Sequence, residues 1–248
     1  MKINVPIMSD VFAEGRKVEY LYWVGCAGAY DNRYMKVAKT FAQILNHLKT
    51  DYAILGTEET CTGDPAKRAG NEIIFQLQAL KLIGIFSKYE VKNIICICPH
   101  CYNILKNEYP DLGGNYNLIH YTEFLKQEII KGNLQLDKSK LKGQTATFHD
   151  PCYLGRGNNI YQAPRDLLKF LGIKHIEMKR NKSFALCCGG GGAQMFKDAE
   201  KGDKEIFIER TEEAIETNAN TIVTSCPFCM TMLTDGIKYK NKEDEIDN

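Results

Sequence analysis

The residues in this sequence that are best able to do chemistry are its ten cysteines, and their spacing repeats along the chain. Thirty-four residues separate Cys26 from Cys61, and thirty-four also separate Cys152 from Cys187. Each half then carries a Cys-Pro-x-Cys motif, at residues 98–101 and 226–229. Such self-similarity at a long offset predicts a duplicated structural unit with one cysteine cluster in each copy.

The second copy contains five cysteines, called here the second cysteine set: Cys152, Cys187, Cys188, Cys226 and Cys229. A structural zinc ion is saturated by four ligands, whereas a polynuclear iron–sulfur cluster can use an additional thiolate. Five thiols, two of them adjacent, therefore favour an iron–sulfur cluster over zinc. A pair of core cysteines or a vicinal disulfide would explain Cys187 and Cys188, but would leave the other three without a role.

The first copy has one thiol fewer, because Thr62 occupies the position that corresponds to Cys188. The first cysteine set is therefore Cys26, Cys61, Cys98 and Cys101. Four thiolates are compatible with a [4Fe-4S] cubane, with zinc, or with a half that is only structural, and the residues do not choose. Cys96 shares a strand face with Cys98, but its counterpart in the second copy is Thr224, which favours a place in the core.

Two histidines and a glycine run accompany the cysteines. His149 precedes Cys152 by three residues, where it could relay protons, tune a cluster or simply orient a turn. His100 lies inside the first Cys-Pro-x-Cys motif and is expected to face solvent or a partner. The glycines at 189–192 fit neither a dinucleotide nor a P-loop fingerprint. We expect them to let the backbone approach a bulky anionic cluster, just before a helix N-terminus.

Short apolar runs alternate with helical periodicity in both copies. The predicted strands are 18–24, 52–55, 93–97, 145–148, 183–186 and 221–224. The predicted helices are 34–48, 72–86 and 193–217. Strands separated by helices form parallel sheets, whose ligands bind beyond the carboxyl ends of the strands. The sequence therefore predicts an α/β fold of two related halves, each with a small parallel sheet flanked by helices and with cysteines at the strand C-terminal ends.

The limits of the copies follow from composition. The segment 132–143 is polar, charged and bracketed by glycine, so it is predicted to be a linker between a first repeat at 18–131 and a second at 144–237. Residues 238–248 are almost wholly polar or charged. They cannot bury enough apolar surface to order themselves, and we expect a frayed tail.

Charge and hydropathy exclude several classes of function. A formal net charge of +1 produces no global field that would attract nucleic acid, so no nucleic-acid partner is expected. The first residues lack the apolar core of a signal peptide, and no run of about 18 apolar residues predicts a membrane span. We therefore expect a cytoplasmic protein, in which clustered cysteines are metal ligands rather than disulfides.

Three motifs resemble the duplicated cysteine-rich CCG domain: HDPCYLGR at 149–156, CCGGGG at 187–192 and CPFCMTML at 226–233. The resemblance extends over residues 18–236 and is closest to heterodisulfide reductase D-type subunits and electron-transfer-flavoprotein:menaquinone oxidoreductases. In heterodisulfide reductases a complete motif binds a noncubane [4Fe-4S] cluster through five cysteines. The resemblance implies the same cofactor on the second cysteine set, whereas Thr62 departs from the motif in the first.

Relatives of this kind carry ferredoxin-like clusters upstream, and no C-x-x-C-x-x-C-x-x-x-C-P motif occurs here. The resemblance therefore implies an iron–sulfur oxidoreductase subunit that carries electrons between a soluble donor, such as electron-transfer flavoprotein, and a quinone-linked or disulfide acceptor. The implied partner is a ferredoxin-like iron–sulfur subunit, soluble or membrane-bound, which would place this protein peripherally at the inner membrane. Two alternatives stay open: direct reduction of a disulfide or heterodisulfide at the second cluster, and a zinc-stabilised binding module.

Overall fold

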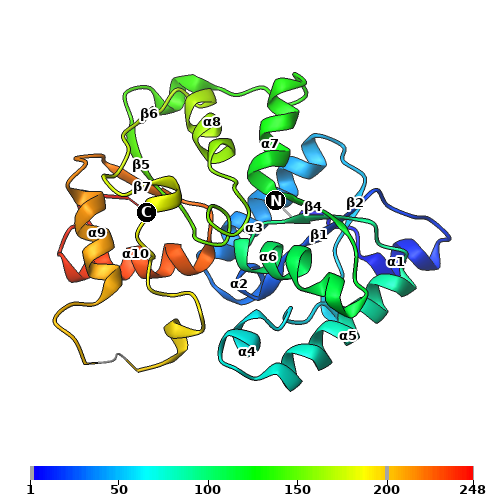
Figure 1. Ribbon diagram of the computed structural model, residues 1–248. Helices are drawn as coiled ribbons and strands as arrows, with labels where there is room; N and C mark the ends of the chain where they lie inside the picture. Colours follow the sequence, from blue (N-terminus) through cyan, green and yellow to red (C-terminus); the bar gives the residue numbers. More distant parts are fainter. Residues whose placement is uncertain (1–2, 199–200, 248) are drawn as a thin grey trace. The chain divides into compact units, whose positions relative to one another are not determined.

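The chain forms two compact units in a computed structural model that describes residues 3–198 and 201–247. The first unit runs to Phe124 and the second begins at Leu125, so the division falls within helix α7 (Tyr121–Ile130) (Figure 1). Each unit has its own parallel sheet, with strand order β2-β1-β3-β4 in the first and β6-β5-β7 in the second. The predicted α/β fold of two halves is confirmed.

The sheet of the first unit is built from β1 (Tyr20–Trp23), β2 (Tyr52–Ala53), β3 (Asn93–Cys96) and β4 (Asn117–His120). β1 is central, because Leu21 pairs with Ala53 on one side and with Ile94 on the other. The sequence does not predict β4, whose only apolar residues are Leu118 and Ile119. Pairing with the buried strand β3, rather than its own composition, makes this segment a strand.

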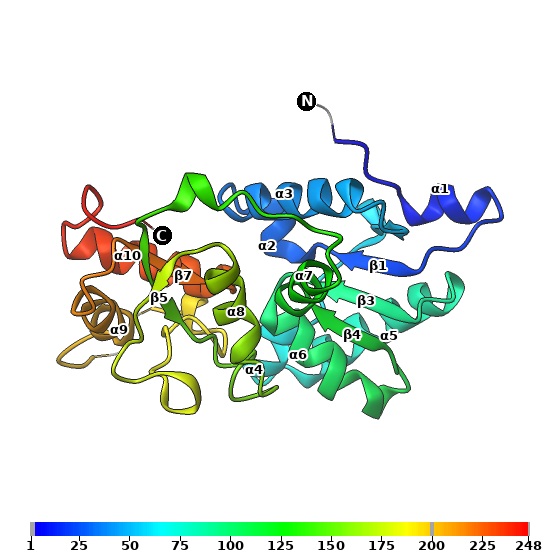
Figure 2. The ribbon, with the colours of Figure 1, turned by 90° about the horizontal axis from the view of Figure 1, so that it is seen from above.

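Helices α3 (Tyr34–His47) and α5 (Glu72–Lys88) lie where the helical periodicity predicts them. Figure 2 shows α3 on one side of the sheet and α5 and α6 (Pro99–Asn107) on the other. Right-handed crossovers require this arrangement, because the chain leaves β1 in one direction to form β2 and returns past it to form β3. The unit also contains α1 (Met8–Ala13), α2 (Gly25–Tyr30), α4 (Asp64–Arg68) and the 3₁₀ turns Gly56–Glu58 and Tyr109–Leu112.

The second unit repeats the order of the first three strands. β5 (Thr145–His149) is central and lies between β6 (Lys174–His175) and β7 (Thr221–Thr224). Helices α8 (Gln162–Phe170), α9 (Ile206–Ile215) and α10 (Pro227–Tyr239) surround the sheet, together with the 3₁₀ turns Lys138–Leu141, Lys182–Phe184 and Gln194–Phe196. One core cluster joins the sheet to α9 and α10 through Ile222, Ala214, Leu233 and Ile237.

Two predicted elements of the second unit are wrong. The segment 183–186 is not a strand, because Lys182–Phe184 forms a 3₁₀ turn. The Ala185 N–H donates to the Lys182 carbonyl, and Arg156 donates to the Ala185 carbonyl. The predicted helix at 193–217 is confirmed only from Ile206 to Ile215. The residues at 197–205 are almost all charged, so this part of the sequence offers no apolar face that could pack.

The C-terminal residues differ from the expected frayed tail. Helix α10 continues to Tyr239, and the chain then returns to the edge strand β7. The Ile222 N–H donates to the Asp247 carbonyl at 2.8 Å, and the Asp247 N–H donates to the Asn220 carbonyl at 3.0 Å. Ile246 packs against the core cluster of the unit. One apolar residue and two backbone hydrogen bonds therefore order a segment whose composition suggested disorder.

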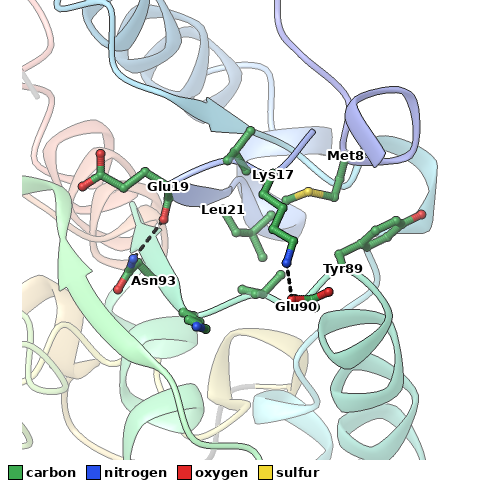
Figure 3. Close-up of a pocket in the computed structure, with 10 residues that line it drawn as sticks. Met8, Lys17, Glu19, Leu21, Tyr89, Glu90 and Asn93 are labelled. Atoms are coloured by element: carbon green, nitrogen blue, oxygen red, sulfur yellow. Dashed lines mark hydrogen bonds and ion pairs between the residues drawn. The ribbon is translucent and has the colours of Figure 1, made fainter. Parts of the chain in front are cut away.

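A hollow of about 150 Å³ lies beside the amino ends of β1 and β3 (Figure 3). The Lys17 ammonium and the Glu90 carboxylate pair across it at 2.6 Å, and the Asn93 amide donates to the Glu19 carbonyl at 3.0 Å. The cysteines follow the opposite, carboxyl ends of these strands, so this hollow is separate from them. Among the helices in the described residues, none combines the length and the apolar character needed to cross a bilayer.

Candidate metal centres

The strand order places the cysteines of each unit at one edge of its sheet. In both units the chain runs from the central strand to one neighbour and then to the other, so the switch in direction lies between β1 and β3, and between β5 and β7. Ligands of parallel α/β sheets bind at this point, beyond the carboxyl ends of the strands. Cys26 follows β1 and Cys98 follows β3, whereas Cys152 follows β5 and Cys226 follows β7.

The two Cys-Pro-x-Cys motifs begin helices in the same way. Cys98 is the N-cap of α6 and Cys226 is the N-cap of α10, each with extended backbone and with proline as the first helical residue. Proline suits this position because its missing N–H would have no partner in the helix. The second cysteine of each motif, Cys101 or Cys229, is buried in the first turn. The positive end of the helix dipole therefore lies beside both thiols of each motif and favours the thiolate form.

The loops that carry Cys61 and Cys187 also match. Gly63 has φ of +88° and Gly189 has φ of +87°, a left-handed conformation that side chains disfavour. In each loop the glycine N–H donates to the thiol two residues earlier, with the nitrogen 3.4 Å from the sulfur. This hydrogen bond stabilises the thiolate. The glycine after the cysteines is therefore a backbone requirement of both loops.

The structure brings the five thiols of the second cysteine set into a chain of contacts. The Cys187 sulfur lies within hydrogen-bonding reach of Cys152 and Cys188, and the Cys229 thiol within reach of Cys188 and Cys226. The pKa of the Cys187 thiol falls to about 2, chiefly because of the hydrogen bond from Cys152 and then that from Cys188. Cys188, Cys226 and Cys229 form a buried group against Phe228 and Met232, whereas Cys152 and Cys187 are partly exposed. The set therefore has a buried side and an accessible side.

The four thiols of the first cysteine set form two pairs. The thiols of Cys26 and Cys61 lie within hydrogen-bonding reach of one another, and so do those of Cys101 and Cys98. The hydrogen bond from Cys26 is the main reason that the pKa of the Cys61 thiol falls to about 6. Thr62 is buried, and its hydroxyl donates to the Cys101 sulfur across 3.9 Å, where Cys188 contacts Cys229 in the other unit. A hydroxyl thus replaces the fifth thiol in the same place without binding a metal as a thiolate would.

Cys96 and His100 clarify what lies near the first cysteine set. Cys96 is fully buried on β3 and pairs in register with His120. The structure therefore places Cys96 in the core, as predicted from its counterpart Thr224 in the second copy. His100 was expected at a surface, but this is wrong: it is 4% exposed, and its Nδ1 lies 2.9 Å from the Asp64 carboxylate. Asp64 also accepts from Arg68 at 3.1 Å, so His100 belongs to a buried ionic network.

His149 lies at the carboxyl end of β5 and is fully buried. A ring nitrogen of His149 and the sulfurs of Cys188 and Cys229 all lie within 4.8 Å of one another. Arg210 donates from Nε to His149 Nδ1 at 2.9 Å. The pKa of His149 is lowered to about 3, mainly by burial and secondly by the positive charge of Arg210. The imidazole is therefore a neutral polar group at the buried side of the second cysteine set.

Asp150 supports the second cysteine set in a way that the sequence does not reveal. It is buried and accepts a bidentate interaction from Arg165, at 2.7 and 2.8 Å. It also accepts the Lys182 N–H at 2.7 Å, so a single carboxylate joins the loop before Cys152 to the loop before Cys187. In the sequence, an aspartate directly before Pro151 indicates no more than a turn. No local pattern signals the network, since Arg165 is 15 residues away along the chain.

The glycine run at 189–192 packs closely against α10. A Cβ on Gly190 would lie 2.8 Å from Met232 Cγ, so only glycine fits there without displacing that side chain. The expectation that a helix follows immediately is wrong, because a single 3₁₀ turn at Gln194–Phe196 comes next. The run therefore allows the loop after Cys188 to approach α10, rather than directing a helix N-terminus at the thiols.

Comparison with known families tests the resemblance seen in the motifs. The profile of the family described as CCG, cysteine-rich domain, matches residues 20–106 and again residues 146–234. The chain belongs to this CCG family. Each match begins in or next to the central strand of its sheet and ends within the helix of its Cys-Pro-x-Cys motif. The CCG unit therefore coincides with the part of each fold that carries the cysteines.

Several curated proteins match nearly the whole length of this CCG-family protein. The probable iron–sulfur-binding oxidoreductase FadF of Bacillus subtilis is 44% identical, over 98% of this chain and 34% of its own length. The EtfAB:quinone oxidoreductase of Syntrophomonas wolfei is 42% identical, over 93% and 33%. The D-type subunit of the dihydromethanophenazine:CoB–CoM heterodisulfide reductase of Methanosarcina barkeri is 32% identical, over 89% and 54%. The chain thus spans about a third to a half of the relatives that it matches.

Proposed function

We propose that this chain is an iron–sulfur subunit of a heterodisulfide reductase-like oxidoreductase, which carries electrons between a soluble donor and a quinone-linked or disulfide acceptor. The observation that supports this most strongly is the set of five contacting thiols in the second unit. Zinc in a structural site would use four of them. A polynuclear cluster can use all five, and it would supply one-electron chemistry at a potential set by burial and by hydrogen bonds to its sulfurs.

The residues assigned to the cluster are the second cysteine set, Cys152, Cys187, Cys188, Cys226 and Cys229. Resemblance to the complete CCG motif favours a noncubane [4Fe-4S] cluster there. The first cysteine set, Cys26, Cys61, Cys98 and Cys101, is assigned to a second metal centre with four thiolates, either a [4Fe-4S] cluster or zinc. Buried thiols at two helix N-termini support metal binding in both units, because the helix dipole favours the thiolate.

The proposed partners follow from the names of the relatives. One relative is named as an EtfAB:quinone oxidoreductase and another as a probable membrane-anchored ferredoxin. We assign electron-transfer flavoprotein as the donor and a ferredoxin-like iron–sulfur protein, soluble or membrane-bound, as the neighbouring carrier. On this proposal the chain acts on the cytoplasmic side of the inner membrane and is held there through that partner.

Direct reduction of a disulfide is a second candidate, because one side of the second cysteine set is accessible. Cys152 and Cys187 are partly exposed, whereas the other three thiols are buried. A disulfide substrate would approach from the exposed side, take up two electrons and two protons, and leave as two thiols. A relative named as a heterodisulfide reductase subunit supports this chemistry.

The test is to purify the chain without oxygen, supply iron and sulfide, and measure bound iron, acid-labile sulfide and zinc alongside the EPR spectrum. We expect iron and sulfide in equal amounts, with an EPR signal that changes on reduction. Cys96→Ala is the matched control, because Cys96 lies in the core outside both sets. A folded protein that binds stoichiometric zinc and no iron would overturn the proposal.

Activity distinguishes the two candidates once a cluster is bound. The electron-carrier proposal predicts that the loaded chain accelerates oxidation of reduced electron-transfer flavoprotein by a quinone in the presence of a ferredoxin-like partner. The disulfide-reductase candidate predicts that the loaded chain alone forms thiols from a disulfide with an artificial reductant. Cys188→Ala should abolish whichever activity is found.

A further inference from the structure

The two ring nitrogens of His149 have different surroundings. Nδ1 lies 2.9 Å from Nε of Arg210. Nε2 is buried and has no hydrogen-bond partner among the described residues. The ring borders the second cysteine set, because one of its nitrogens and the sulfurs of Cys188 and Cys229 lie within 4.8 Å of one another. An unpaired polar atom in such a place requires an explanation, because burying it without a partner costs free energy.

Arg210 determines which nitrogen of His149 carries the proton. A guanidinium is a hydrogen-bond donor only and keeps its charge in proteins. Its Nε–H therefore occupies the lone pair of Nδ1, and the proton of the neutral imidazole must be on Nε2. Arg210 is held in this orientation, because it is fully buried and also donates from Nη1 to the Glu213 carboxylate and to the Arg180 carbonyl, at 2.9 and 2.8 Å.

This arrangement is the reverse of that around a metal-ligating histidine. Such a histidine usually donates its second ring N–H to a carboxylate or a carbonyl, which leaves the other nitrogen free to bind metal. His149 instead accepts at Nδ1 and has a proton on Nε2, so neither nitrogen offers a lone pair to a metal. A proton relay through the ring is also excluded, because the group at Nδ1 cannot give up its proton.

The corresponding position in the first unit carries Trp23, which also precedes the first cysteine of its set by three residues. Trp23 pairs across the sheet with Cys96, and His149 pairs with Thr224, two residues before the Cys-Pro-x-Cys motif in each case. Trp23 is fully buried, and its Nε1 has no hydrogen-bond partner among the residues that the structure describes. An indole N–H can only donate.

The Trp23 indole and Cys101 approach one another beside Gly25. A Cβ added to Gly25 would lie 3.6 Å from Cys101 Sγ and 3.7 Å from Trp23 Nε1. The pKa of the Cys101 thiol is raised by its hydrogen bond to Cys98 and by burial, while the Trp23 N–H acts in the opposite direction. The second thiol of the Cys-Pro-x-Cys motif thus has a buried N–H group nearby in both units.

We infer that each unit carries a buried N–H donor at the end of its central strand, His149 Nε2 in the second and Trp23 Nε1 in the first, which hydrogen-bonds to cluster or cysteine sulfur. These are positioning residues, not ligands, and the inference rests on the proposed function. Hydrogen bonds to sulfur stabilise the more negative, reduced state of a cluster. The donors therefore raise its reduction potential, and Arg210 keeps His149 in the donor form.

Potentiometry followed by EPR tests the effect on the loaded protein, with iron content measured in parallel. His149→Phe should shift the midpoint potential of the second unit's cluster to more negative values at unchanged iron content. His149→Gln should stay close to the parent protein, because its amide can both accept from Arg210 and donate to sulfur. Trp23→Phe removes only the N–H from an aromatic side chain, and should shift the potential of a cluster in the first unit. Equal potentials in all variants at full iron content would overturn the inference.

A second measurement does not depend on a cluster. In protein labelled with ¹⁵N-histidine and free of iron, two-bond ¹H–¹⁵N NMR identifies the protonated nitrogen, and His149→Gln assigns the signal. We expect His149 to be protonated on Nε2 alone, and protonation on Nδ1 would overturn the inference. In loaded protein, ¹⁵N pulsed EPR should give the weak coupling of a hydrogen bond, whereas strong coupling would show direct ligation. Absence of iron from the parent protein would instead contradict the proposed function.

Discussion

The two units share their framework and differ in one thiol. Both have a Cys-Pro-x-Cys helix start and a left-handed glycine after the central cysteine. Both also have, at the end of the central strand, a buried ring nitrogen with no hydrogen-bond partner among the described residues. They differ at Thr62 and Cys188, where a hydroxyl in the first unit contacts the sulfur that a thiol contacts in the second. The backbone that positions the cysteines is therefore independent of the fifth thiol. A single side chain changes the number of grouped thiols from five to four.

The units also stabilise their first cysteine by different means. In the first unit the Glu59 carboxylate accepts the N–H groups of Val24 and Gly25, next to Cys26, and burial raises its pKa to about 7. In the second unit Asp150 is paired with Arg165 and joins two loops. Similar loops are thus held by a lone carboxylate in one unit and by a buried ion pair in the other, so their tolerance of substitution should differ.

The largest effect is expected from removal of the fifth thiol. Cys188→Ala should abolish iron binding by the second cysteine set, because it removes a buried ligand that contacts both Cys187 and Cys229. Iron and sulfide analysis together with visible absorption would measure the loss. Thr62→Ala is the matched change in the first unit and should leave the metal content unchanged. Equal loss in both variants would contradict the five-to-four comparison.

The next largest effect concerns the buried ion pair between Arg165 and Asp150 in the second unit. Arg165→Met leaves the buried carboxylate of Asp150 without its charged partner, and removal of one partner of a buried pair costs about 3–5 kcal/mol. Urea unfolding followed by circular dichroism would measure the free energy. Lys126→Met is the control, since Lys126 pairs with Asp166 near the surface and such pairs contribute about 1 kcal/mol or less. A similar loss of unfolding free energy in both variants would show that burial of the Asp150–Arg165 pair does not increase its contribution to stability.

Alanine at the two left-handed glycines compares the loops directly. The left-handed backbone conformation alone should lower the free energy of unfolding by about 1–2 kcal/mol in both Gly63→Ala and Gly189→Ala. Gly63→Ala should cost more, because its Cβ would lie 3.0 Å from the Phe75 ring, whereas that of Gly189→Ala would be 3.5 Å or more from its neighbours. Thermal unfolding of the two variants measures the difference. A larger loss for Gly189→Ala would show that this steric argument is wrong.

The smallest disturbance of the fold is expected from adding the missing thiol. Thr62→Cys preserves the size of a buried side chain that already contacts Cys101, so the stability should change little. The variant should increase the iron bound by the first unit and give it spectroscopic features of the second. The cleanest background is Cys188→Ala, in which any iron is attributable to the first cysteine set. Unchanged iron content in that double variant would show that the ligand count is not what distinguishes the units.

Much of the site could be predicted from sequence because the signal is covalent spacing. The duplication, the two cysteine sets and the strands before Cys26, Cys98 and Cys226 follow from motifs and local periodicity, and the CCG family match confirms the resemblance. The errors arose where distant groups override local preference. The segment 183–186 forms no strand because a 3₁₀ turn begins at Lys182 and Arg156 binds the Ala185 carbonyl. The tail is ordered because Asp247 forms backbone hydrogen bonds with Asn220 and Ile222 at the edge strand.

The sequence by itself determined which thiols are grouped, with five in one set and four in the other, because the residue types and their spacing are properties of the covalent chain. The tertiary structure alone decided what surrounds them. Folding sets Arg210 against His149 from 61 residues away, and Arg165 against Asp150 from 15. Hydrogen-bond direction, tautomer and burial depend on which groups meet in space, and no local pattern encodes that meeting. The sequence around His149 left its role open. The donor role that we infer for it rests on the Arg210 guanidinium, which can only donate.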